Sequence, residues 1–272
     1  MCEGFGVYDA QFLGLTVEVP DPAPEIADDV VVVDGTSQWD YVHFSLALSA
    51  SRRLARWVAW NIDGLRLFPG DSIPRDSERF RLDPRIPAEL QTGEAVYADN
   101  DLDRGHLARR SDLLWGTLDE AEAANHDSFY FTNIAPQMAG FNQSGLDGVW
   151  GLLEDAVLQE AGLELRRLTL FGGPVLTTAD LVYRGVLIPG AYWKVIVYVL
   201  AGTPSARCFV LAQDLDPLTL APTLDDFATF EVSLAQLEEV TALGFASLHE
   251  GSMAVQSVAP ARRVADVADV DW

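Results

Sequence analysis

Lysine and cysteine are nearly absent from this 272-residue chain, and no long apolar run occurs in it. The two cysteines, Cys2 and Cys208, are too few for a cysteine-rich zinc site and argue against a disulfide framework. No apolar stretch approaches the ~18–20 residues of a membrane span, so we expect no association with a membrane. The first residues also lack the basic and apolar regions of a secretory signal. We therefore expect a cytoplasmic protein, or one exported by a route that leaves no mark in the sequence.

Positive charge is scarce as well. The 18 basic residues against 41 acidic ones give a formal net charge of −23, which argues against general adhesion to nucleic acids or anionic membranes. Lys194 is the single lysine, and we interpret the preference for arginine mostly as compositional background, although arginine suits bidentate phosphate binding. Residues 52–110, however, contain 11 arginines and 10 acidic residues, so the rest of the chain carries about −24. The cationic groups are thus concentrated in one segment.

The apolar pattern predicts a globular α+β domain, with 49% apolar and 10% aromatic residues. Runs of β-branched and aromatic residues predict strands at 31–36, 41–50, 57–62, 129–132, 166–175, 192–202 and 207–215. The predicted helices lie at 119–128 (or a turn), at 147–161 with Gly162 as the residue after its end, and at 233–243. We expect a mixed, mostly antiparallel central sheet flanked by helices.

Other segments are expected to be irregular. Proline and charge dominate residues 65–98, and so long a loop within a compact domain is usually functional or mobile. Pro136 is expected to end the strand that contains residues 129–132. The last dozen residues are expected to fray.

The segment 99–112, "DNDLDRGHLARRSD", concentrates charge around one histidine. A metal site, a solvated charged loop and a catalytic base in an anion-binding setting are all compatible with it. Gly105 allows a sharp turn beside a ligand, His106 is a natural general base near neutral pH, and Arg104 can grip a phosphate with two hydrogen bonds. The histidines expected to be structural or solvated are His43, His126 and His249.

Oxygen donors follow downstream of this segment. Asn133 comes just after a predicted strand, Asn142 follows nine residues later, and a predicted helix presents Glu154. Amide and carboxylate oxygens suit Mg²⁺, which keeps most of its waters and takes few protein ligands. Asp99 and Asp101 lack partners at the spacing that a two-carboxylate metal site needs. The combination favours a phosphodiester site with one metal ion and one base.

With "DRGH", "TNIAPQ", "FNQ" and "WGLLED" in this order, the chain resembles the DNA/RNA non-specific endonucleases, sugar-non-specific nucleases that include mitochondrial endonuclease G. The resemblance runs from about Tyr41 to Phe245 and includes "WVAWNI", "RFRLDPRIP" and "LEEVTALGF". It implies a ββα-metal (His-Me finger) core. We expect an N-terminal extension at 1–40 packed on the domain, an endonuclease domain at 41–248 and a C-terminal tail at 249–272.

The resemblance also implies a role for each matching residue. His106 would be the general base that deprotonates the attacking water, and Asn142 the one direct protein ligand of Mg²⁺, with Mn²⁺ as a possible substitute. Glu154 would be hydrogen-bonded to metal-bound waters. Arg104 would steady the phosphates near the scissile bond, and Asn133 would orient the His106 strand or a water.

Other matches are less close. Arg75, Arg79 and Arg109 are expected to bind substrate, although ion pairs with nearby aspartates would suit Arg109 equally well. Asp103 is expected to anchor the loop.

Two features depart from the family pattern. Asn142 lies further from Glu154 than in the family, because "SGLDG" lengthens the turn between them, and this insertion could bulge harmlessly or mispoint Asn142. Many members have an arginine one turn after the glutamate, where this chain has Leu158.

These observations predict a Mg²⁺-dependent endonuclease that hydrolyses DNA, RNA or both with little sequence preference, because phosphate contacts position a substrate without reading its bases. One alternative is a catalytically degenerate module of the same fold that binds nucleic acid or protein. Another is a phosphodiesterase for small nucleotides, which would suit the acidic surface. A homodimer and a protein inhibitor are possible partners.

Overall fold

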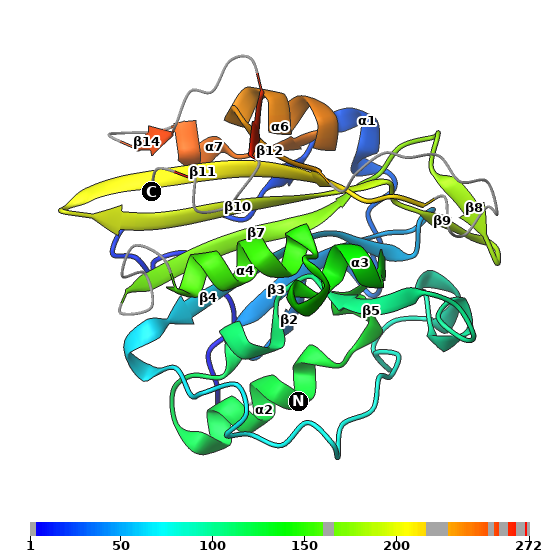
Figure 1. Cartoon of the computed structure of the whole chain (residues 1–272), viewed down its shortest axis with the longest axis horizontal. Helices are drawn as coiled ribbons and strands as arrows, with labels where there is room; N and C mark the ends of the chain where they lie inside the picture. Colours follow the sequence, from blue (N-terminus) through cyan, green and yellow to red (C-terminus); the bar gives the residue numbers. More distant parts are fainter. Residues whose placement is uncertain are drawn as a thin grey trace.

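The computed structural model describes residues 4–159, 166–215, 228–249, 253–255, 261–264 and 270. A central sheet of nine strands runs through the molecule (Figure 1), in the order β15-β12-β11-β10-β7-β4-β3-β2, with β14 beside β11. Neighbouring strands are antiparallel except β14 and β11, which are parallel. This mostly antiparallel sheet with its flanking helices confirms the predicted fold class.

The strands of this sheet are β2 (Trp39–Tyr41), β3 (Phe44–Ser49), β4 (Leu54–Asp63), β7 (Arg167–Val175), β10 (Ala191–Leu200), β11 (Thr203–Ala212), β12 (Ala228–Val232), β14 (Ala254–Val255) and β15 (Arg262–Val264). Every residue of β4 is buried. The sequence of a strand is continuously apolar when both faces of its sheet are covered, which explains the "WVAWNI" run.

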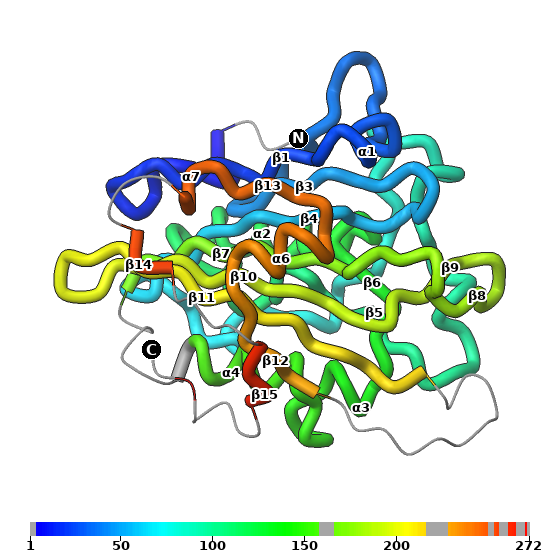
Figure 2. The backbone as a smooth tube through the Cα atoms, turned by 90° about the horizontal axis from the view of Figure 1, so that it is seen from above, coloured from blue at the N-terminus to red at the C-terminus, as the bar shows by residue number. Residues whose placement is uncertain are grey.

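Helices and short strands cover the two faces of the sheet (Figures 1 and 2). The elements on the first face are α1 (Pro24–Ala27), α6 (Leu234–Thr241), α7 (Ala246–His249) and the strand pair β1 (Asp21–Pro22) and β13 (Leu243–Gly244). The elements on the second face are α2 (Leu118–Ser128), α3 (Ala139–Asn142), α4 (Val149–Gln159) and the hairpin of β5 (Leu102–His106) and β6 (Ile134–Met138). Each face of the sheet has its own hydrophobic core, and β4 contributes to both. Trp57 packs in the core of the first face and Trp60 in the core of the second.

Two strand predictions were wrong. Residues 31–36 form only isolated bridges around a turn at Asp34, whose φ is 51°. Residues 129–132 end α2 and enter a 3-10 turn, Phe131–Asn133, and the strand follows at Ile134–Met138 with Pro136 inside it. Proline is tolerated there because β6 has only β5 as a partner and so needs no second row of hydrogen bonds.

Other predictions held in outline. Residues 65–98 are irregular, with 3-10 turns at η1 (Gly64–Arg66), η2 (Ala88–Leu90) and η3 (Glu94–Val96). The segment 41–50 turns at His43 and makes a fully buried β3 rather than a half-buried strand. Gly162 lies outside the described residues, as does the side chain of Leu158.

At the chain ends, the described part of 249–272 does not fray, because Arg262–Val264 pair with β12. The limits predicted for the three domains stay predictions. A further hairpin is formed by β8 (Leu181–Tyr183) and β9 (Val186–Ile188). No helix among the described residues is both long and apolar enough to cross a membrane.

Candidate active site

The β5–β6 hairpin carries the "DRGH" motif. His106 lies opposite Ile134 and Arg104 opposite Pro136 in an antiparallel ladder. A Cβ at Gly105 would collide with the side-chain amide of Gln137, so only glycine fits between the two functional side chains.

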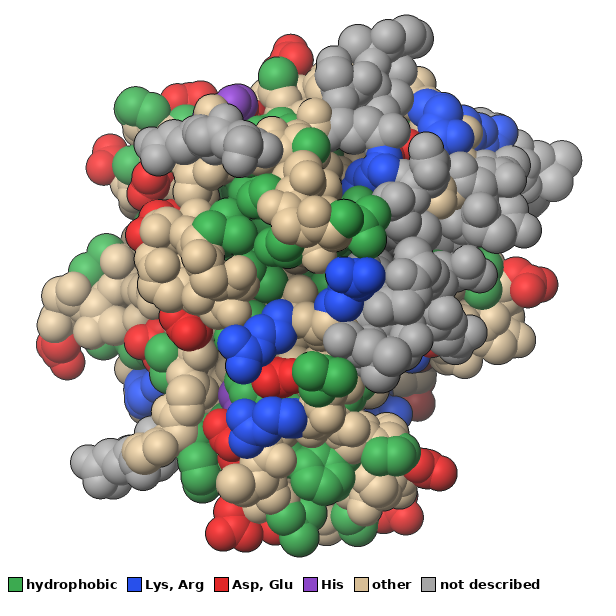
Figure 3. Space-filling model, turned by 90° about the vertical axis from the view of Figure 1, so that its left-hand side faces the viewer, with side chains coloured by type: hydrophobic (Ala, Val, Ile, Leu, Met, Phe, Trp, Pro, Cys, Tyr) green, Lys and Arg blue, Asp and Glu red, His purple; other side chains and the backbone are tan. Residues whose placement is uncertain are grey.

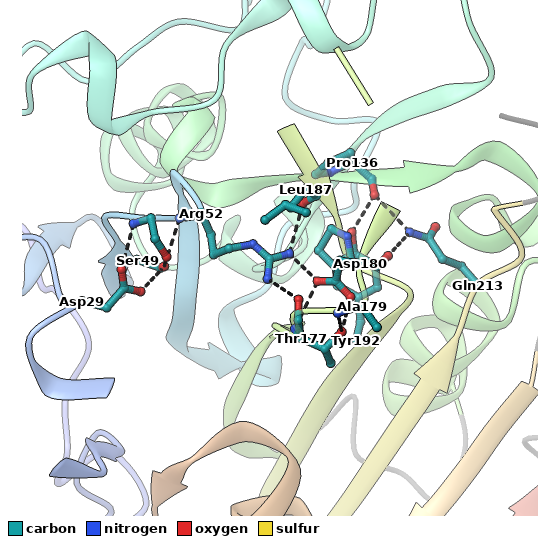
Figure 4. Close-up of polar contacts among 12 residues, drawn as sticks. Asp29, Ser49, Arg52, Pro136, Thr177, Ala179, Asp180, Leu187, Tyr192 and Gln213 are labelled. Atoms are coloured by element: carbon teal, nitrogen blue, oxygen red, sulfur yellow. Dashed lines mark hydrogen bonds and ion pairs between the residues drawn. The ribbon is translucent and has the colours of Figure 1, made fainter. Parts of the chain in front are cut away.

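Two side chains of the central sheet hold this hairpin in place. The Tyr192 hydroxyl donates to the Pro136 carbonyl oxygen at 2.6 Å, and the Gln213 amide donates to the same oxygen at 3.2 Å. Gln213 also accepts a bond of 2.8 Å from the Met138 amide. Figure 4 shows both side chains converging on Pro136, beside the buried pair of Arg52 and Asp180. The motif therefore sits on a rigid support.

Asn133 fixes the chain that leaves β5. Its buried side chain accepts from the Ala108 amide at 2.9 Å and donates to the Ala108 carbonyl at 3.0 Å, while its own carbonyl accepts from the Leu107 amide at 2.9 Å. These bonds lie next to His106. Asn133 does not line the cleft described below, so its contacts fit the predicted orienting role on the strand rather than on a water.

Most of the predicted site residues line one cleft of about 440 Å³. The charged and polar side chains around it are those of Arg75, Arg104, His106, Arg109, Arg110, Ser111, Asn142, Gln143, Ser144 and Glu154. The predicted Arg79 is not among them, because its guanidinium donates to the carbonyls of Asp76 and Glu78 at 3.0 and 2.7 Å. Figure 3 shows one face of the molecule, on which basic side chains lie among acidic ones.

His106 is held as a neutral imidazole. Its Nε2 atom is buried and has no hydrogen-bond partner among the described residues, and the rings of Phe80 and Phe129 lie 5.8 and 5.5 Å away. Burial, followed by the charges of Arg75 and Arg110, lowers its pKa to about 3. The ring is therefore unprotonated at neutral pH and available to accept a proton.

The guanidinium of Arg104 is already paired with a carboxylate of the same chain. Its guanidinium forms a two-pronged ion pair with Glu94, with one contact at 2.9 Å from Nε to Oε2. This pairing raises the pKa of Arg104. The rings of Phe80 and Tyr97 lie 5.5 Å from its Cζ atom and keep the guanidinium in the plane that a phosphate would also use.

The inserted turn leaves Asn142 in the cleft. Its Nδ2 donates to Asp103 at 2.9 Å, so Asp103 holds the Asn142 amide, and the amide oxygen makes no hydrogen bond to any described residue. A Cβ at Gly148 would lie 2.6 Å from the Phe141 carbonyl, and one at Gly151 would lie 2.7 Å from the Asn142 carbonyl. These two glycines let the turn pack directly on α4, and Ser144–Leu146 form a 3-10 turn between Asn142 and the helix.

Glu154 projects from α4 into the floor of the cleft. Its Oε1 accepts a 2.9 Å bond from Lys194, and its Oε2 lies 3.5 Å from Nε of Arg109. Arg109 also pairs with an aspartate, Asp155, at 2.7 Å, and its predicted binding of substrate stays a prediction. The sequence analysis missed Lys194, although a single lysine within the apolar strand "AYWKVIVYVL" was an available signal.

Arg110 also lines the cleft. It donates to the carbonyls of Gly70 and Ile73 and to Asn125, and so holds the irregular segment against α2. Arg75, by contrast, forms no ion pair with any described residue and lies over the ring of Phe129 at 5.9 Å. Arg75 is thus the cleft arginine left available for an anion.

The cleft offers a cation few protein ligands. The described residues contain no group of three His, Cys, Asp or Glu side chains that could hold a metal ion. The candidate metal ligands that we assign in the cleft are the amide oxygen of Asn142 and the Oε2 atom of Glu154. This sparse set of hard oxygen donors fits Mg²⁺, which commonly keeps several waters, and does not fit zinc.

The comparisons with known proteins agree with this arrangement. The model of the DNA/RNA non-specific endonuclease family matches residues 26–250. The chain belongs to this family, and its fold is that of a family of nucleases.

The chain is also similar to individual proteins. The chain is 35% identical to the uncharacterized protein y4fB of Sinorhizobium fredii over 85% of its length and spans 36% of that protein. It is 26% identical to nuclease C1 of Cunninghamella echinulata, covering 74% of the chain and 80% of the nuclease. A crystal structure of a complex of EndoG with EndoGI, which concerns EndoG inhibition, superposes with a TM-score of 0.65 at 17% identity, over 90% of this chain and 94% of the other.

Proposed function

We propose that this protein is a metal-dependent endonuclease that hydrolyses phosphodiester bonds of DNA, RNA or both. The observation that supports the proposal is the convergence of His106, Asn142, Glu154 and two arginines, Arg75 and Arg104, on one cleft. A base, a hard-oxygen donor pair and anion-binding groups are the parts that phosphodiester hydrolysis needs.

His106 is proposed as the general base that takes a proton from the attacking water. In the free protein its pKa of about 3 makes it a weak base, because burial and then Arg75 and Arg110 oppose its protonation. A bound phosphodiester brings a negative charge toward these arginines. Substrate binding therefore raises the basicity of His106 when it is needed.

Asn142 and Glu154 are proposed as the residues that hold Mg²⁺, with Mn²⁺ as an alternative ion for the same donors. The Asn142 amide oxygen would be the direct ligand, and Glu154 would accept hydrogen bonds from metal-bound waters. When bound, the ion stabilises negative charge on the phosphate and on the leaving 3′ oxygen.

Arg104 and Arg75 are proposed to bind the phosphates on either side of the scissile bond. Both present guanidinium groups to the cleft, and phosphate contacts carry no sequence information. We therefore expect cleavage with little sequence preference.

The test is cleavage of supercoiled plasmid and of a structured RNA, with Mg²⁺ and with EDTA. His106→Ala is expected to lose ~10²–10⁴-fold of the activity, the usual contribution of a general base. His126→Ala is the matched control, because His126 is an exposed histidine paired with Glu78 outside the cleft.

Other outcomes would separate the alternatives. Nucleic-acid binding without cleavage in Mg²⁺ or Mn²⁺ would replace the proposal with the degenerate binding module. A preference for dinucleotides over polymers would indicate the small-nucleotide phosphodiesterase. Homodimerisation and binding of a protein inhibitor stay predictions, tested by the mass of the protein in solution and by titration against candidate inhibitors.

A further inference from the structure

The single lysine of the chain lies directly beneath the cleft. Lys194 is in the middle of β10, and 1% of its side chain is exposed. Its Nζ atom lies 3.9 Å from the centre of the Trp150 ring and 5.6 Å from that of Trp60, and it donates to Glu154 at 2.9 Å. Lys194 does not line the cleft, whereas Glu154 does.

The strand next to β10 leaves room for this side chain. Lys194 faces Gly172 of β7, and a Cβ at Gly172 would lie 3.3 Å from the Trp60 ring. The glycine thus allows Trp60 and the lysine stem to pack side by side on the face that α4 covers. The "FGGP" of β7 and the "YWKV" of β10 together build a slot for one buried cation.

Stability alone does not explain a cation in this slot. Taking two charges out of water costs several kcal/mol per ion, and an apolar pair of similar volume is often as stable or more so. The chain otherwise avoids lysine altogether. The buried charge is therefore best explained by what it does to Glu154, whose other oxygen reaches the cleft.

We infer that Lys194 is a positioning residue, which fixes one oxygen of Glu154 so that the second oxygen points into the cleft toward the metal-bound waters. This inference rests on the proposed function. With Oε1 held by the ammonium group, the carboxylate is fixed in one orientation. Arg109, 3.5 Å from Oε2, is 28% exposed and cannot impose that orientation from beneath.

The test measures Mn²⁺ affinity by titration calorimetry in the absence of nucleic acid. Lys194→Met is expected to weaken binding ~10–100-fold, which is the usual cost of removing an outer-shell partner. Lys194→Arg is expected to restore most of the affinity, because it can donate to the same oxygen. If Lys194 acted only by electrostatic repulsion of the metal ion, Lys194→Met would instead strengthen Mn²⁺ binding, because a nearby positive charge would be lost.

The matched control is Arg207→Met. Arg207, in β11, forms another buried pair with Glu231 at 3.2 Å, and Glu231 keeps Arg262 as a second partner just as Glu154 keeps Arg109. This variant removes an equivalent cation and is expected to leave Mn²⁺ affinity unchanged.

A second comparison covers the case in which Lys194→Met alone fails to fold. Glu154→Gln and the double variant Glu154→Gln with Lys194→Met both lack the carboxylate that Lys194→Met alone would leave without its buried cation. If Lys194 acts through Glu154, both bind Mn²⁺ equally; a further loss in the double variant would overturn the inference.

The remaining outcomes separate this inference from the proposed function. Unchanged Mn²⁺ affinity of Lys194→Met in a protein that cleaves nucleic acid overturns the inference and leaves the function standing. Lysine-dependent Mn²⁺ binding without any cleavage supports the inference and overturns the function. A wild-type protein that binds no Mn²⁺ overturns both.

Discussion

At the scale of single residues, Glu94 pairs with Arg104, the guanidinium that we propose binds a substrate phosphate. We predict that Glu94→Gln lowers the KM for a short oligonucleotide about two- to fivefold, because an exposed ion pair of up to ~1 kcal/mol no longer has to be broken. Steady-state kinetics at fixed Mg²⁺ measure the change. Glu89→Gln, in the neighbouring turn η2, is the control. An increased KM would show instead that Glu94 positions Arg104.

Asp112 is a buried carboxyl group with an unusual pH dependence. Burial, with Glu154 nearby, raises its pKa from 3.8 to about 7, against the opposing effects of Arg109 and Lys194. Between pH 4 and 7 the folded protein thus holds a proton that the unfolded chain releases, and the stability from this group falls as the pH rises through that window.

We therefore predict that the melting temperature falls more between pH 5 and pH 8 in the wild type than in Asp112→Asn, which cannot ionise. The difference between the two proteins isolates Asp112 from the other acidic groups. Thermal unfolding at matched ionic strength measures it. Parallel pH profiles for the two proteins would show that Asp112 ionises as freely as in the unfolded chain.

At the scale of elements, the Asn142 turn and α4 act as one unit because two glycines let their backbones touch. We predict that Gly151→Ala lowers activity at least ~10-fold, since the new Cβ would lie 2.6 Å from the Ser144 amide nitrogen and would shift Asn142. Alanine favours a helix over glycine by about 1 kcal/mol, so weaker helix formation cannot cause the loss.

Gly145→Ala is the matched control for this prediction. Gly145 lies in the same turn, but a Cβ there meets nothing within 4 Å. Equal activity of the two variants would show that close packing of the turn on α4 does not set the position of Asn142.

The comparison of sequence and structure is also clearest for elements. The strands around "WVAWNI" and "YWKVIVYVL" were predictable, because a sheet covered on both faces requires continuous apolar runs. The strand with Pro136 was misplaced by a few residues, because a lone two-stranded hairpin accepts a proline that a larger sheet would exclude.

The lining of the cleft was predictable where a local motif carries the residue, since His106 of "DRGH" and Asn142 of "FNQ" both line it. Lys194 and Glu94 were not found, because their roles depend on contacts with residues 40 positions away and on an ion pair across an irregular loop. No local spacing encodes either contact.

At the scale of the whole molecule, a strongly acidic protein is proposed to act on a polyanion through a small arginine cluster. Arg75 and Arg104 are the two cleft arginines proposed to bind phosphates. Two phosphate contacts predict a slope of about −2 for the logarithm of kcat/KM against the logarithm of salt concentration. The acidic remainder of the surface works in the opposite direction, because salt screens its repulsion of the substrate. We therefore expect activity on plasmid DNA to fall as NaCl rises from low to physiological concentration, and Arg75→Gln to reduce the slope by about 1. A flat profile for the wild type would mean that surface repulsion cancels the arginine contacts, and the cleft would then have to bind its substrate mainly through the metal ion.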